Sequence, residues 1–279
     1  MKEPNPKIYL LPNLMTMGNL FCGFTAVLKI VEGALLQSAD ADAAAELFHT
    51  AIWFILGACF FDLLDGRLAR LGGHESAFGR EFDSLADIVS FGVAPALMVY
   101  RIVLQEFPRA CWIIAFIYLA CGALRLARFN TVSAGQENSS NGHPEKNFTG
   151  FPIPAAAGLI ASITLFLLWW AAGEHQLGHW KFVLPPLLLF LSFMMFSRVQ
   201  YPSFKALNWK TKRSIPRFIA IVAILVFTVM NYEWMPAVLF LSYLLYGFLR
   251  PWLSREWRRE IEEEIGEEPL DGEPLEETP

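Results

Sequence analysis

Charged residues are scarce in this chain. Asp, Glu, Lys and Arg together make up 18% of its 279 residues, whereas hydrophobic residues make up 54%. A soluble domain usually carries about 25% charged residues and disperses its apolar residues along the chain. Here the apolar residues are grouped into long runs. The composition therefore excludes an ordinary soluble domain and predicts an all-α, polytopic integral membrane helix bundle.

Cysteine is equally scarce, and its positions exclude two kinds of site. All four cysteines lie within apolar runs, at no spacing typical of metal ligands: Cys22, Cys59, Cys111 and Cys121. We interpret them as small buried hydrophobic residues rather than zinc ligands or disulfide partners. The first apolar run also lacks a small-residue cleavage site and is followed by further runs. It is therefore interpreted as a membrane span and not as a signal peptide.

The apolar runs predict about eight spans. Four lie near residues 14–36, 49–70, 79–103 and 109–128, and a fifth follows the Gly-Phe-Pro-Ile-Pro segment at 150–154 and ends near residue 172. Three shorter runs lie near residues 181–197, 215–232 and 234–250. A bilayer needs about 20 apolar residues per helix, so the last three spans are less clearly defined. We expect six helices to form the core, with two more at the C-terminal end.

Two regions are expected: a membrane-embedded domain at residues 1–253 and a tail at residues 254–279. The tail holds eleven of the 27 acidic residues but only three arginines, so the net charge of −5 describes the tail more than the membrane body. Its Pro and Glu content predicts disorder.

The basic residues predict the orientation in the membrane. If the N-terminus is cytoplasmic, eighteen of the 22 Lys and Arg residues fall on the cytoplasmic side of the predicted spans. Cytoplasmic loops of membrane proteins carry such an excess. We therefore expect an integral protein of the cell (inner) membrane, with both termini in the cytoplasm.

Four aspartates stand out between the second and third spans, in residues 62–87. Asp62 and Asp65 are three residues apart near the end of one predicted helix, and Asp83 and Asp87 are four apart near the start of the next. Each pair lies on one helix face. Both pairs fall on the same side of the membrane, which the topology predicts to be cytoplasmic.

Carboxylates beside apolar spans are costly and are candidates for function. If the two helices face each other, four carboxylates are crowded at low dielectric and need cations. Hard oxygen ligands of this kind suit Mg²⁺, Mn²⁺ or Ca²⁺ rather than zinc. The sequence therefore predicts a divalent metal site; the alternative is two solvated helix faces.

The spacing D-x-x-D-G-x-x-A-R-x8-G-x3-D-x3-D resembles the signature of the CDP-alcohol phosphatidyltransferase family, and residues 62–87 match each of its fixed positions. The resemblance implies a CDP-activated lipid donor, two Mg²⁺ or Mn²⁺ ions and an alcohol that displaces CMP. It further implies a homodimer. No nucleic acid is expected as a partner.

Roles carried over from the family follow the motif. Asp62, Asp65, Asp83 and Asp87 would be metal ligands. Asp83 and Asp87 would also be catalytic, with Asp87 as the general base, close to or sharing a metal. Gly66, Ala69 and Gly79 would make room for the cytidine nucleotide, which Arg70 would contact. Asn13 and Thr16, in the polar first turns of the first span, are expected to line the same cavity; polar contacts between helices are the alternative reading.

Segments outside the motif resemble the membrane phosphatidylserine synthases of bacteria and archaea. These segments are Leu11–Gly23, Ser90–Pro95, Arg125–Asn130, Gly150–Pro154 and the region around Ser197–Ser203. The resemblance implies CDP-diacylglycerol as donor, L-serine as acceptor and phosphatidylserine as product. Arg125 and Arg128 are candidates for the serine carboxylate or the lipid phosphate. Their alternative role is anchoring at the membrane edge.

Two other functions are considered. A relative in the same family that accepts glycerol 3-phosphate or an inositol phosphate should have more basic residues around the site. A transporter should place its carboxylates near mid-span and show inverted repeats or broken helices. The aspartates cluster at one interface and no internal repeat is visible, which argues against transport.

Overall fold

The computed structural model of the protein describes residues 10–71, 77–104, 111–137, 150–172, 180–197 and 214–249. Throughout these ranges the regular elements are helical and none is a strand, which confirms the all-α prediction. The α-helices are α1 (Leu10–Leu36), α2 (Ala41–Leu71), α3 (Ala77–Asp87), α4 (Ala94–Ile102), α5 (Cys111–Glu137), α6 (Ile153–Ala172), α7 (Leu184–Phe196), α8 (Ser214–Met230) and α9 (Met235–Leu249).

Within the described residues, five helical segments are long and apolar enough to cross a membrane, which confirms a polytopic membrane bundle. They are Asn13–Leu36, Ala41–Leu68, Phe78–Ile102, Trp112–Thr131 and Ile153–Ala171. The helices α7, α8 and α9 are apolar but shorter, so their crossing of the membrane stays a prediction. The basic segment at residues 198–213 and the acidic segment at residues 254–279 lie outside the described residues.

Helix α2 begins before the second span that the sequence predicts. The span was expected near residues 49–70, but the helix starts at Ala41. The Asp40 carboxylate accepts a hydrogen bond from the Ala43 backbone N–H at 3.0 Å and so caps the helix. The alanines that follow are strong helix formers. Residues 41–48, which precede the predicted span, therefore belong to the helix.

The third span contains a π-helical turn that the sequence reading did not predict. Between α3 and α4 lies η1 (Ile88–Val93), and the Ala94 N–H donates to the Val89 carbonyl, five residues earlier. The Tyr118 hydroxyl of α5 donates to the Phe91 carbonyl at 3.0 Å, so a neighbouring helix supports this turn. Such turns occur frequently at functional sites, and this one begins directly after Asp87.

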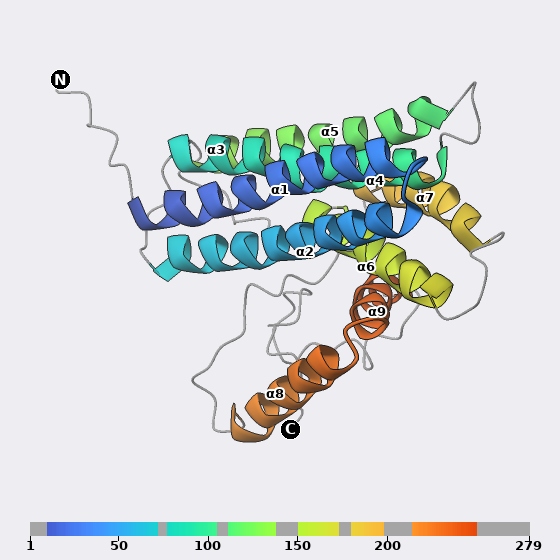
Figure 1. Cartoon of the computed structure of the whole chain (residues 1–279). Helices are drawn as coiled ribbons and strands as arrows, with labels where there is room; N and C mark the ends of the chain where they lie inside the picture. Colours follow the sequence, from blue (N-terminus) through green and yellow to red (C-terminus); the bar gives the residue numbers. More distant parts are fainter. Residues whose placement is uncertain are drawn as a thin grey trace.

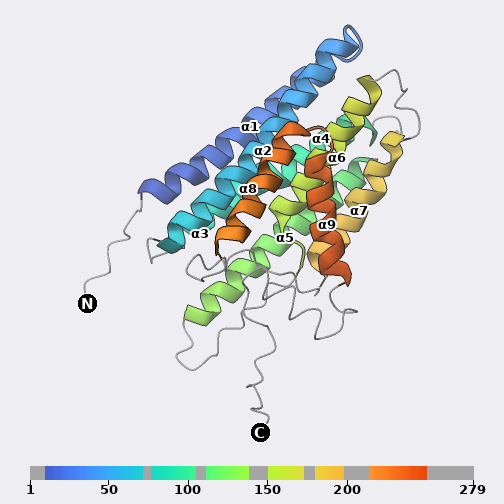
Figure 2. The same ribbon diagram turned by 90° about the horizontal axis from the view of Figure 1, so that it is seen from below.

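Helices α1 and α2 run side by side along most of their length, and α3, η1 and α4 pack on α1 (Figures 1 and 2). Helix α6 packs against α2, and α7 against α5. The start of α1, the end of α2 and the start of α3 lie at one end of the bundle, to the left in Figure 1. The packing therefore brings both aspartate pairs to the same end.

Glycine allows α1 to approach η1 closely. A Cβ added at Gly23 would meet the Ser90 side chain and would lie 2.6 Å from the Ser90 Cα. Backbone atoms cannot move aside as a flexible side chain can. The α1–η1 contact therefore requires a residue without a side chain at position 23.

We expect Gly23→Ala to destabilise the protein by about 1–3 kcal/mol, because the added methyl group overpacks this contact. Thermal unfolding in detergent measures the change. Gly57→Ala is the matched control, since its Cβ would meet its nearest neighbour, the Cys22 Sγ, at an ordinary 3.7 Å. Equal melting temperatures for the two variants would contradict the close approach.

Candidate functional site

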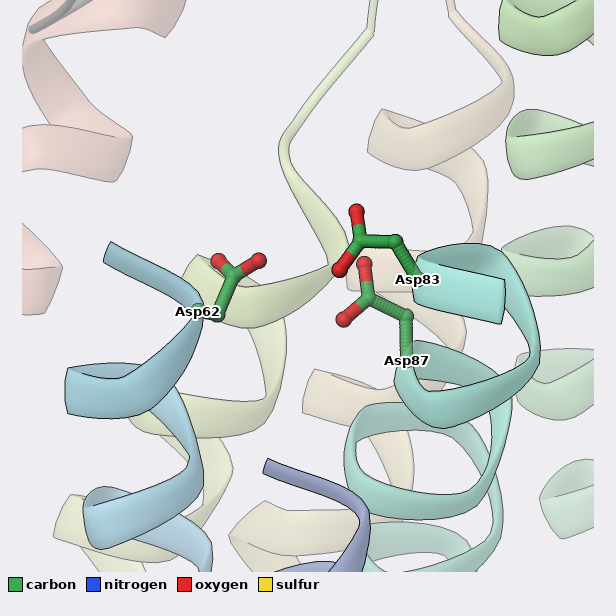
Figure 3. Close-up of side chains that lie close together, drawn as sticks. All are labelled: Asp62, Asp83 and Asp87. Atoms are coloured by element: carbon green, nitrogen blue, oxygen red, sulfur yellow. The ribbon is translucent and has the colours of Figure 1, made fainter. Parts of the chain in front are cut away.

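Three carboxylates converge at the end of the bundle where α2 ends and α3 begins. Asp62 comes from α2, Asp83 and Asp87 come from α3, and one oxygen of each lies within 4.8 Å of the others. Figure 3 shows the Asp83 and Asp87 side chains extending from α3 toward α2 and Asp62. Three of the four aspartates therefore meet as the helical spacing predicts.

Asp65 lies beside this group rather than within it. Its side chain is buried, and its Oδ2 accepts a hydrogen bond from the Thr16 hydroxyl of α1 at 3.2 Å. Asp65 also interacts electrostatically with Asp83 and Asp62. Thr16 thus contacts one of the motif aspartates across two helices, and its expected place in a nucleotide cavity stays a prediction.

Asp87 is buried as well, and its hydrogen-bond partner is Asn19, to which the sequence analysis assigns no role. The Asn19 amide of α1 donates to the Asp87 Oδ1 at 3.0 Å. Asn19 belongs to the polar run Asn-Leu-Met-Thr-Met-Gly-Asn at residues 13–19, which was the one available signal for it. The sequence does not reveal which turn of α1 faces Asp87, so this contact required the structure.

The donor set at the three-carboxylate group fits a hard divalent cation. Each aspartate offers an oxygen, and the group is spaced so that one ion is within reach of several ligands. Carboxylates this close, beside apolar helices, repel one another strongly unless a cation is shared. Mg²⁺ and Mn²⁺ prefer oxygen ligands of this kind. The acidic group is thus suited to hold a divalent metal ion.

Arg125, on α5, supplies positive charge near the carboxylates. It is half-buried and interacts electrostatically with Asp87 and Asp62. Its Nε atom is buried without a hydrogen-bond partner among the described residues. Buried polar atoms are normally satisfied, so this atom is suited to an anionic ligand. Arg128, one turn further on, is exposed.

The remaining predicted site residues lie on the same helices. Asn13 is half-buried on the first turn of α1, Gly66 on α2 and Gly79 on α3. Ala69 and Arg70 belong to the last turn of α2, but their side chains lie outside the described part of the chain. Their expected contacts with a nucleotide stay predictions.

The family model for CDP-alcohol phosphatidyltransferases matches residues 9–196 of the chain. This match spans α1 to α7 and includes every aspartate of the site. The chain belongs to the CDP-alcohol phosphatidyltransferase family.

Curated relatives agree with this assignment. The chain is 36% identical to a CDP-diacylglycerol–serine O-phosphatidyltransferase of Helicobacter pylori, over 89% of this chain and 93% of the relative. It is 31% identical to an enzyme of the same name from Bacillus subtilis, over 70% of this chain and 91% of the relative. It is 33% identical to an archaetidylserine synthase of Methanothermobacter thermautotrophicus, over 69% of each chain.

We expect Mn²⁺ to raise the melting temperature of the detergent-solubilised protein, because an ion bound only by the folded state stabilises it. At a concentration 100 times the dissociation constant this amounts to about 2.7 kcal/mol. Asp83→Asn keeps the side-chain shape and should abolish the shift. Asp42→Asn, at the exposed start of α2, should keep it. An unchanged shift in Asp83→Asn would place the metal elsewhere.

Proposed function

We propose that the protein transfers the phosphatidyl group of CDP-diacylglycerol to the hydroxyl of L-serine, giving phosphatidylserine and CMP, and that the reaction depends on divalent metal ions. The observation that carries this proposal is the convergence of Asp62, Asp83 and Asp87 at one end of the bundle. These residues belong to the family signature at residues 62–87. A shared group of carboxylates suits a reaction in which a pyrophosphate must be neutralised.

In this proposal Asp62, Asp65, Asp83 and Asp87 hold two Mg²⁺ or Mn²⁺ ions, with Asp87 at their edge. When bound, such ions neutralise charge on the phosphates and on the departing nucleotide. The buried position of Asp65 and its hydrogen bond from Thr16 support a fixed ligand orientation. Asp83 and Asp87 face Asp62 across the gap between α3 and α2, which supports sharing of ions (Figure 3).

The cytidine nucleotide is proposed to bind beside these carboxylates. The residues assigned to it are Asn13, Thr16, Asp62, Gly66, Ala69, Arg70 and Gly79. Small residues at positions 66, 69 and 79 leave room next to the aspartates, and the guanidinium of Arg70 matches a phosphate. Their common location on the ends of α1, α2 and α3 supports this assignment.

Asp87 is proposed as the general base. Its carboxylate accepts the proton of the serine hydroxyl, and the freed oxygen attacks the phosphorus that carries the diacylglycerol. A bond forms between the serine oxygen and this phosphorus. The bond from phosphorus to the oxygen bridging it to CMP breaks, and CMP leaves with that electron pair. A carboxylate within reach of the attacking hydroxyl is suited to this proton transfer.

Serine as the acceptor is supported by the relatives. The names of the Helicobacter and Bacillus relatives specify serine, and the archaeal relative is named for archaetidylserine. The proposed partner for the serine carboxylate or the lipid phosphate is Arg125, whose Nε is buried and whose guanidinium interacts electrostatically with Asp87 and Asp62. Arg128 is exposed and is assigned the weaker role, at the lipid phosphate or the membrane edge.

The proposed setting is the cell (inner) membrane, with the carboxylates and both termini on the cytoplasmic side. The distribution of Lys and Arg supports this orientation. Residues 1–253 are proposed as the catalytic membrane domain and residues 254–279 as a separate acidic tail. Family resemblance supports a homodimer.

The central test is release of CMP by purified protein supplied with CDP-diacylglycerol, Mn²⁺ and one acceptor at a time. We expect release with serine and not with glycerol 3-phosphate or inositol phosphate. EDTA should abolish the reaction, and Asp87→Asn should lower kcat at least about 100-fold, the usual size of a general-base contribution.

Each of the other possible outcomes would reject a different part of the proposal. Release with another acceptor would keep the family reaction and reject serine. Full activity of Asp87→Asn would reject the assigned base. An absence of CMP release with every acceptor, in protein that melts cooperatively, would reject the transferase proposal and favour a transport role for the carboxylates.

Arg125→Lys tests the proposed anion contact. Lysine keeps the positive charge but lacks the planar fork. Loss of a charge-assisted hydrogen bond should raise the KM of the substrate that Arg125 binds about tenfold or more, while the other KM changes little. Arg101→Lys, at the far end of the third span in α4, is the control. Unchanged KM values for both serine and CDP-diacylglycerol would leave Arg125 with an anchoring role.

A further inference from the structure

Asn19 is the buried polar residue through which α1 contacts Asp87. Its relative exposure is 0%, and its Nδ2 donates to the Asp87 Oδ1 at 3.0 Å. A single directed hydrogen bond on one carboxylate oxygen restricts rotation of the carboxylate. The other oxygen remains available for a ligand or a proton.

The backbone of Asn19 is fixed by the same segment that follows Asp87. The Ser90 hydroxyl, in the π-helical turn η1, donates to the Asn19 carbonyl at 3.0 Å. Gly23, one helical turn further along α1, allows the close approach that this bond needs. Asn19 is thus held by η1 through its backbone and holds Asp87 through its side chain.

Local folding does not explain an asparagine at this position. Its Oδ1 is buried without a hydrogen-bond partner among the described residues. A buried acceptor in this state is destabilising, and an apolar residue of the same volume would avoid it. The hydrogen bond that the amide donates to Asp87 therefore explains the asparagine better than packing alone does.

We propose that Asn19 is a positioning residue, which orients the Asp87 carboxylate toward the acceptor hydroxyl. This inference rests on the proposed function, since it requires Asp87 to be the base. The contact also gives a physical reason for two segments outside the aspartate motif, Leu11–Gly23 and Ser90–Pro95. Together they form the α1–η1 support behind Asp87.

Two substitutions separate the hydrogen bond from packing. Asn19→Leu keeps the branching at Cγ in a somewhat larger, apolar side chain and removes the donor. Asn19→Ser keeps a donor and leaves a space that a water molecule fills and bridges. If the bond orients Asp87, kcat falls about 10–100-fold in Asn19→Leu, as for other residues that orient catalytic ligands, and less in Asn19→Ser. The KM for CDP-diacylglycerol should stay within about twofold in both.

The control is Asn231→Leu, because the Asn231 amide also donates a hydrogen bond, to the Phe227 carbonyl at 3.1 Å after the end of α8. It should leave kcat unchanged. Wild-type protein and Asp87→Asn are assayed alongside, and melting temperatures report folding.

Three results would overturn the inference. An unchanged kcat in Asn19→Leu, with Asp87→Asn inactive, would overturn it and leave the proposed function intact. Higher activity of Asn19→Leu than of Asn19→Ser would assign Asn19 to packing, because the rank order then follows volume and not the donor. An inactive wild type would overturn the proposed function and the inference together.

Discussion

The repulsion among carboxylates at the edge of an apolar bundle is the constraint on which this structure depends. Asp62, Asp83 and Asp87 present oxygens within 4.8 Å of one another, and Asp65 is buried beside them. In a low-dielectric setting such a group is unfavourable unless a cation is shared. The fold must therefore hold the aspartates in place against this repulsion, with the Arg125 guanidinium of α5 as one nearby positive charge. This need explains why their supports come from a separate helix, α1.

Helix α1 contacts one aspartate of each pair, and the π-helical turn η1, through three hydrogen bonds. Thr16 donates to Asp65, Asn19 donates to Asp87, and Ser90 donates to the Asn19 backbone. Each bond crosses between helices, where small residues permit close approach. The first span of the chain thus contacts aspartates of the second and third. In our account, the proposed phosphatidyl transfer depends on these hydrogen bonds as well as on the aspartates.

Much of this arrangement was predictable from the sequence. Apolar runs predict helices, and spacings of three and four residues place Asp62 with Asp65 and Asp83 with Asp87 on single faces. The partner of Asp87 was not predictable, because it depends on the register between α1 and α3; Asn19 and Asp87 are 68 residues apart in the chain. The π-helical turn at Ile88–Val93 has no marker in composition or periodicity. Helix α2 begins early, at Ala41, because the Asp40 carboxylate caps it there, in a segment too polar to be predicted as part of the span.

The central claim is that the α2 and α3 carboxylates share divalent cations. Anomalous diffraction from crystals grown with Mn²⁺ tests it most directly, because the signal locates the ion independently of activity. The account predicts anomalous density between Asp62, Asp83 and Asp87. Manganese bound only at other acidic residues, with the gap between α2 and α3 bridged by a cationic side chain, would contradict it.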